Sequence, residues 1–98
     1  MSEREMEIKD VLVFPQGIAL AGAEPDAGLA QVADDSLRAL VGARITITRP
    51  DGAQVAATVL EVRITRSVAD RRNVYIGVPA DTGLGIGDVG GTVGLATT

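Results

Sequence analysis

Apolar and polar residues alternate along several short segments of the chain, which is the spacing of a β-strand that turns one face toward a core. In 43–49, Ile45 and Ile47 alternate with polar side chains, and 73–78 repeats this pattern. Four further segments contain short apolar runs together with the same alternation of apolar and polar residues. These segments are 7–14, 18–22, 54–65 and 91–95. The pattern therefore predicts six short strands.

The same positions predict which side chains face the core. In the strand at 7–14, we expect Ile8, Leu12 and Phe14 to share one face. The inward residues expected from the later strands are Leu60, Val62 and Ile64, followed by Val74, Ile76 and Val78. Because almost all of these residues are aliphatic, the core should be aliphatic too.

Turn signals separate the predicted strands. Residues 49–52 read RPDG, in which proline fixes one φ angle, aspartate can bond its own backbone and glycine supplies a positive φ, so a hairpin is expected there. Asp34 or Asp35 can cap one or two helical turns that end at Gly42. Longer connections are expected at 23–36, 67–72 and 79–87.

These elements predict an all-β fold, because no long helical pattern intervenes between the strands. We expect a small closed or partly open six-stranded β-barrel with at most one short helical turn. The charged and aperiodic start predicts a disordered N-terminal tail at 1–6, followed by a single domain at 7–98. At 98 residues, the chain has room for one core.

The composition removes most catalytic chemistry. The chain contains no histidine and no cysteine, so the usual general base, the commonest metal ligand and any thiolate nucleophile are absent. Carboxylates are paired at Asp34 with Asp35 and at Asp81 with Asp88, but all four lie in predicted loops. The glycine-rich run at 83–87 lacks the strand and helix of a nucleotide-binding loop. We therefore expect no enzyme, no cofactor and no metal site.

No apolar run reaches the roughly 18–20 residues that cross a bilayer, and charged residues stand where a signal peptide has its apolar stretch. We expect a cytoplasmic location and no membrane contact. The net charge of −4 also disfavours nucleic acid as a partner, since proteins that bind nucleic acid usually have a basic excess.

Charge is nevertheless unevenly distributed. Residues 1–35 carry eight acidic and two basic residues, whereas residues 36–75 carry seven arginines and three acids. Arg44 and Arg63 lie on strands expected to pair across the 49–52 hairpin, so together with Arg66 they predict a basic face. The residues predicted to contact a partner are Arg44, Arg63, Arg66, Arg71, Arg72 and Tyr75.

Three segments carry a family resemblance. Residues 8–22 read IKDVLVFPQGIALAG, residues 40–52 read LVGARITITRPDG, and residues 87–95 read GDVGGTVGL. This pattern resembles the second-domain β-barrel of translational GTPases of the elongation factor Tu type. The chain departs from it by one deletion after Pro15 and by Ala43 in place of the usual acid. The GTPase domain is absent, so the resemblance implies a contact module.

The leading expectation is a non-catalytic module that binds a protein, of the adaptor or immunity type, through strand faces and the loops at 23–36 and 66–72. Two alternatives remain open. One is a translation-associated accessory that binds RNA or the ribosome through Arg44, Arg63 and Arg66. The other is a small enzyme or ligand carrier with a pocket lined by loops.

Overall fold

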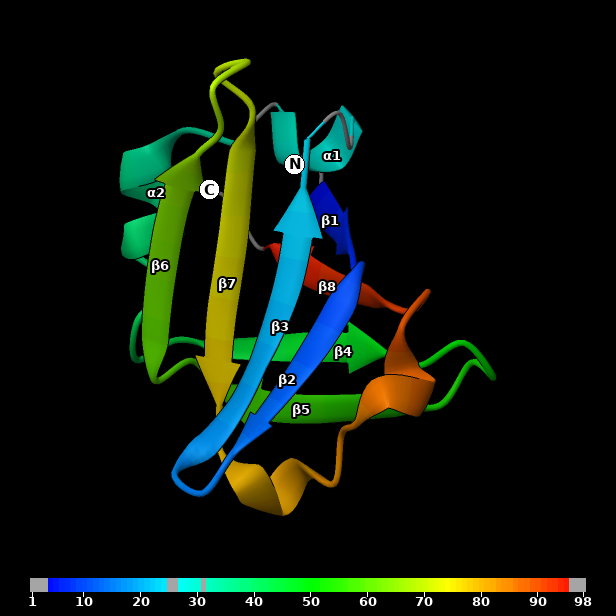
Figure 1. Ribbon diagram of the computed structural model, residues 1–98. Coiled ribbons are helices and arrows are strands. Elements are labelled where there is room, and N and C mark those ends of the chain that lie inside the picture. The colour runs from blue at the N-terminus through cyan, green and yellow to red at the C-terminus, as the bar shows by residue number, and fades with distance from the viewer. Residues whose placement is uncertain (1–3, 25–26, 31, 96–98) are drawn as a thin grey trace.

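Two four-stranded antiparallel sheets make up most of the structure, a computed structural model that describes residues 4–24, 27–30 and 32–95 (Figure 1). In order across the first sheet, the strands are β1 (Arg4–Glu7), β8 (Thr92–Leu95), β4 (Arg44–Thr48) and β5 (Gln54–Thr58). Across the second sheet, they are β2 (Asp10–Phe14), β3 (Gly17–Ala23), β7 (Arg72–Val78) and β6 (Glu61–Arg66). The predicted mostly β class is confirmed.

The chain passes directly from one sheet to the other at two corners. Between β1 and β2, the Ile8 carbonyl accepts a hydrogen bond from Gly90 N at 2.9 Å, and Lys9 N donates to the Ala21 carbonyl at 2.7 Å. Ile8 is thus bonded to the approach to β8, and Lys9 to β3. The hydrogen-bond pairing therefore groups the strands into two four-stranded sheets, which the chain joins at this corner.

The second corner divides the strand predicted at 54–65. At this corner, Val59 N donates to the Ala43 carbonyl at 2.9 Å, whereas Leu60 N donates to the Gly77 carbonyl at 2.8 Å. The backbone therefore changes partner within two residues. β5 pairs with β4, and β6 pairs with β7.

The predicted hairpin at 49–52 is confirmed, because β4 and β5 pair as antiparallel neighbours on either side of it. Gly52 N donates to the Arg49 carbonyl at 2.9 Å, and Gly52 has a φ of 93°. Asp51 accepts a hydrogen bond from Ala53 N through its side chain, at 2.9 Å. Asp51 and Gly52 thus have the roles in the turn that the sequence predicts.

The predicted tail at 1–6 is wrong where the structure describes it. Arg4–Glu7 pairs with β8, and Met6 is completely buried. Glu5, Met6, Glu7 and Ile8 alternate between exposed and buried positions, which is the period of a strand. The charged residues that suggested a tail are the solvent-facing half of that pattern. Residues 1–3 lie outside the described residues.

Two short connections cover the openings between the sheets. α1 (Ala27–Ala30) packs against β1 and α2 (Asp34–Arg38) against β6, so the segment between β3 and β4 bridges both sheets at one end. At the other end, the 3₁₀ turn η1 (Ala80–Thr82) touches β5 and β3, while η2 (Ile86–Asp88) touches β2. The structure thus holds more helical turns than the single one predicted.

The core between the sheets is aliphatic apart from Met6, as expected. The fully buried side chains include Leu20, Ile47, Val74, Ile76, Val78 and Leu95, and the connections add Leu29 and Leu37. Ile8 and the inward set of β7 lie where the alternation predicts. Val62 and Ile64 are partly buried against this core.

Three residues predicted to face inward do not. Leu12, Phe14 and Leu60 are 37%, 47% and 51% exposed. In β2 the core-facing residue is Val11, because the corner at Ile8 and Lys9 breaks the alternation that would have carried Leu12 inward. Leu60 lies at the second corner.

Candidate binding groove

The outer face of the second sheet has a floor of small residues. Cross-strand pairing places Leu12, Ala19, Gly77 and Glu61 in one row and Asp10, Ala21, Tyr75 and Arg63 in another. Between these rows, Val11, Leu20, Ile76 and Val62 form the row that turns to the core. In these two outer rows, glycine and alanine therefore occupy the middle two strands, except at Tyr75.

Larger side chains stand on both sides of this floor and leave a groove of about 770 Å³. Leu12 and Phe14 of β2 line one side of the groove, and Leu60 precedes β6 on the other. Tyr75 also lines it, so the groove contains both aromatic residues of the chain. We call this feature the β2–β6 groove.

Glu61 and Arg63 are the charged residues that line the β2–β6 groove. The Arg63 guanidinium donates to the Glu61 carboxylate at 3.1 Å, and the two side chains are 70% and 62% exposed. An ion pair this exposed contributes little to stability. Glu61 and Arg63 can therefore give up their mutual ion pair and pair with charged groups of a binding partner at a small cost in free energy.

The predicted partner-binding residues are dispersed over the molecule. Arg63 and Tyr75 line the groove, but Arg44 lies on β4 of the other sheet, in register with Thr58. Arg66 lies an odd number of positions from Arg63, so their side chains leave β6 toward opposite faces. The basic face of Arg44, Arg63 and Arg66 is not assembled, because the corner at Val59 and Leu60 carries β6 away from β4.

Arg66 and Arg71 are at the end of the β6–β7 hairpin. Arg66 forms ion pairs with Asp34 at 3.1 Å and with Asp70 at 3.5 Å. Arg71 is exposed, and its backbone N–H donates to the Ser67 hydroxyl at 3.2 Å. Arg71 is therefore the more available of these two cations.

Arg72 is buried, with 6% of its surface exposed, and its guanidinium is fully engaged inside the protein. Nε donates to Glu24 at 2.7 Å, and one terminal nitrogen donates to Asp34 at 2.8 Å. The two terminal nitrogens also donate to the carbonyls of Val32 and Leu29, each at 2.8 Å. Arg72 thus fixes the connection that carries α1 and α2 and is not available to a partner.

This arginine also sets the ionisation of its two carboxylates. Hydrogen bonding from Arg72 holds the pKa of Glu24 below its ordinary value and overcomes partial burial, which acts in the opposite direction. The pKa of Asp34 is lowered in the same way, with a further contribution from Arg66. Both acids are therefore kept as anions that anchor arginines.

The other paired carboxylates do not form a site either. Asp88 is 8% exposed, forms an ion pair with Arg49 at 3.0 Å and accepts a hydrogen bond from Gly85 N at 2.8 Å. Asp81 is exposed. Within the described residues, no three acidic side chains gather closely enough to hold a metal ion.

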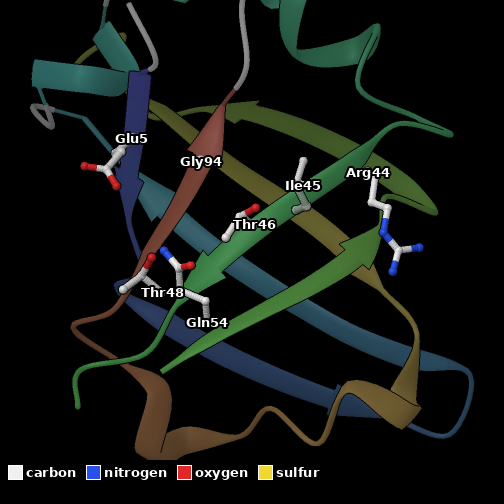
Figure 2. Close-up of a pocket in the computed structure, with 7 residues that line it drawn as sticks. All are labelled: Glu5, Arg44, Ile45, Thr46, Thr48, Gln54 and Gly94. Carbon is white, nitrogen blue, oxygen red and sulfur yellow. The ribbon is translucent and has the colours of Figure 1, made fainter. Parts of the chain in front are cut away.

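A second, smaller hollow of about 300 Å³ lies on the outer face of the first sheet. Its polar lining includes Glu5, Arg44, Thr46, Thr48 and Gln54. Figure 2 shows Glu5 and Arg44 at opposite ends, with the threonines and Gln54 between them. The two charged groups do not converge on a common point, so the hollow offers no ligand a concentrated set of contacts.

Sequence reasoning found Arg63 and Tyr75 but missed the hydrophobic part of the groove. One signal was present: Gly77 interrupts the apolar run of β7, and glycine inside a strand often marks a close approach by another group. A Cβ atom at Gly77 would lie 3.4 Å from Cβ of Glu61. The glycine therefore keeps the floor open.

No protein-family model, curated protein or solved structure matches the chain. In the part of the chain that the structure describes, no helix has the length and apolar character needed to span a membrane.

Proposed function

We propose that the protein is a non-catalytic module that binds another protein through the β2–β6 groove, in the manner of an adaptor or an immunity-type partner. The observation that carries this proposal is the exposure of Leu12, Phe14 and Leu60 around a floor of glycine and alanine. Aromatic residues and arginine are enriched where protein interfaces hold most of their binding energy. Tyr75 and Arg63 supply those residue types in the same groove.

We also propose that the two sheets act together as the six-stranded barrel of the elongation factor Tu domain 2 type. The support comes from the two corners, where a strand leaves one sheet and continues in the other. Counting β1 with β2 and β5 with β6 as single bent strands gives six strands in a ring. Such a barrel acts by contact with another macromolecule.

The test fills the groove without touching the core. Ala19→Leu places a larger side chain on the floor, and Ala56→Leu makes the same change on the exposed outer face of the first sheet. Quantitative mass spectrometry compares the proteins captured from native lysate by wild type and by both variants. We expect a specific partner to be lost with Ala19→Leu and kept with Ala56→Leu. Equal capture by all three would contradict the proposal.

A further inference from the structure

The β2–β6 groove carries protruding and recessed parts on one face. Leu12, Phe14 and Leu60 project at its sides, while Ala19 and Gly77 form its floor. In a dimer with two-fold symmetry, the same patch of both copies meets itself, so the patch must complement itself in shape. A face with apolar knobs beside an apolar hollow satisfies this requirement.

The charges of the groove are self-complementary as well. Glu61 and Arg63 are on the same face of β6, two residues apart, and carry opposite signs. Two copies related by a two-fold axis can place Glu61 of each opposite Arg63 of the other. The groove is locally neutral, although the chain has a net charge of −4. Two copies of an acidic protein repel each other, and this repulsion is smallest when they meet through such a neutral face.

We propose that the groove is occupied by a second copy of this chain in a two-fold dimer. Leu12, Phe14 and Leu60 of each copy fill the floor of the other, and the two Glu61–Arg63 pairs exchange partners across the interface. The inference rests on the proposed function, because it names the partner of the same groove. Each copy is then a protein-binding module, and the protein that it binds is a second copy of the same chain.

The size of the molecule permits this interface. A specific interface of standard size takes about 800 Å² from each partner, which is about one seventh of the 5483 Å² accessible to the described protein. The remaining acidic surface should make dimerisation stronger at high salt, where the repulsion of two like-charged copies is screened.

Sedimentation analysis tests the dimer directly, from about 1 µM to about 1 mM protein, a range that spans weak to moderate complexes. We expect a monomer–dimer equilibrium that shifts toward the dimer when salt is raised. Ala19→Leu should weaken dimerisation at least about tenfold, or about 1.4 kcal/mol. Ala56→Leu should leave it unchanged, and circular dichroism melting should show that both variants fold.

Charge reversal separates a second copy from any other partner. Glu61→Arg and Arg63→Glu should each weaken the dimer, because each creates two like charges that face each other across the axis. The double variant Glu61→Arg/Arg63→Glu should restore it, since both copies then carry the reversed pair. A different protein docked on the groove would not be restored by the double reversal.

Monomers at every concentration, or a dimer that Ala19→Leu leaves intact, would overturn this inference. The proposed function has its own readout, the partner captured from lysate. A monomeric chain that still loses a captured protein on Ala19→Leu would refute the dimer and keep the function. A dimer with no other captured partner would support the dimer alone.

Discussion

At the scale of single residues, Arg72 forms the most extensive set of side-chain hydrogen bonds described above. Its guanidinium links the end of β7 to Glu24, to Asp34 and to two backbone carbonyls of the α1–α2 connection. A planar group with several fixed N–H donors can bind all of these acceptors at once, and an ammonium group cannot. This one side chain therefore helps to hold both short helices in place, beside the core contacts of Leu29 and Leu37.

Replacing Arg72 with lysine should lower the free energy of unfolding by roughly 3 kcal/mol, because buried acceptors lose their donors. Arg71→Lys is the matched control at the neighbouring exposed position, and it should change stability by less than about 0.5 kcal/mol. Urea unfolding followed by circular dichroism measures both. Equal stability of the two variants would mean that the connection is held by its apolar contacts alone.

Acidification should weaken the same contact. The pKa values of Glu24 and Asp34 lie below their ordinary values of 4.5 and 3.8, chiefly because Arg72 donates hydrogen bonds to both. Their contribution to stability is complete above those ordinary values and is lost as pH falls through the lower folded values. Urea midpoints measured from neutral pH to about pH 3 should fall less steeply in Arg72→Lys than in wild type. Parallel curves would contradict this assignment.

At the scale of elements, the alternation of apolar and polar residues predicted where strands lie, but it did not predict the corners at which a strand passes from one sheet to the other. The strands β4, β7 and β8 lie within one residue of their predicted bounds, because each stays in one sheet and buries one face. In the segment 54–65, the inward-facing residues have odd numbers up to Val59 and even numbers from Val62, so the alternation changes phase at Val59 and Leu60. The hydrogen-bonding partners that make this phase change a corner come from strands distant in sequence.

Glycines show where elements approach too closely for a side chain. At Gly91, which leads into β8, a Cβ atom would collide with the Thr48 carbonyl oxygen and lie 3.1 Å from that of Asp88. Gly91→Ala should therefore cost about 1–3 kcal/mol, as overpacking does. At Gly87 a Cβ meets nothing within 4 Å, so Gly87→Ala should be neutral or stabilise by up to about 1 kcal/mol. Thermal unfolding of the two variants checks this order.

At the scale of the whole molecule, the arginines serve mainly to bind the protein's own acids. Arg49, Arg66 and Arg72 each contact at least one carboxylate that lies far away in sequence. Composition revealed the excess of arginine in residues 36–75, but not this neutralisation, because ion pairs between loops depend on the fold. Arg63 and Tyr75 could be predicted as binding residues from the sequence. The exposure of Leu12, Phe14 and Leu60 could not, because it depends on the two corners at which the chain changes sheet.

This arrangement predicts weak binding to RNA. A labelled single-stranded RNA should show no saturable change in fluorescence anisotropy up to about 100 µM protein at low salt, the range in which non-specific binders respond. Arg63→Gln and Arg66→Gln should make no difference to that result. Binding that falls steeply with salt and disappears in these variants would favour the translation-associated alternative.

The pairing of β1 with β8 has a consequence for synthesis. These strands come from opposite ends of the described chain, yet β8 lies between β1 and β4 in the first sheet. During translation, β1 leaves the ribosome before β8 does, and Met6 cannot be fully buried until β8 has followed. Contacts between such distant segments fold slowly and leave partly folded chains exposed. The first sheet is therefore completed only after β8 has been synthesised, and a product cut short before β8 would offer its unpaired strands to chaperones and proteases.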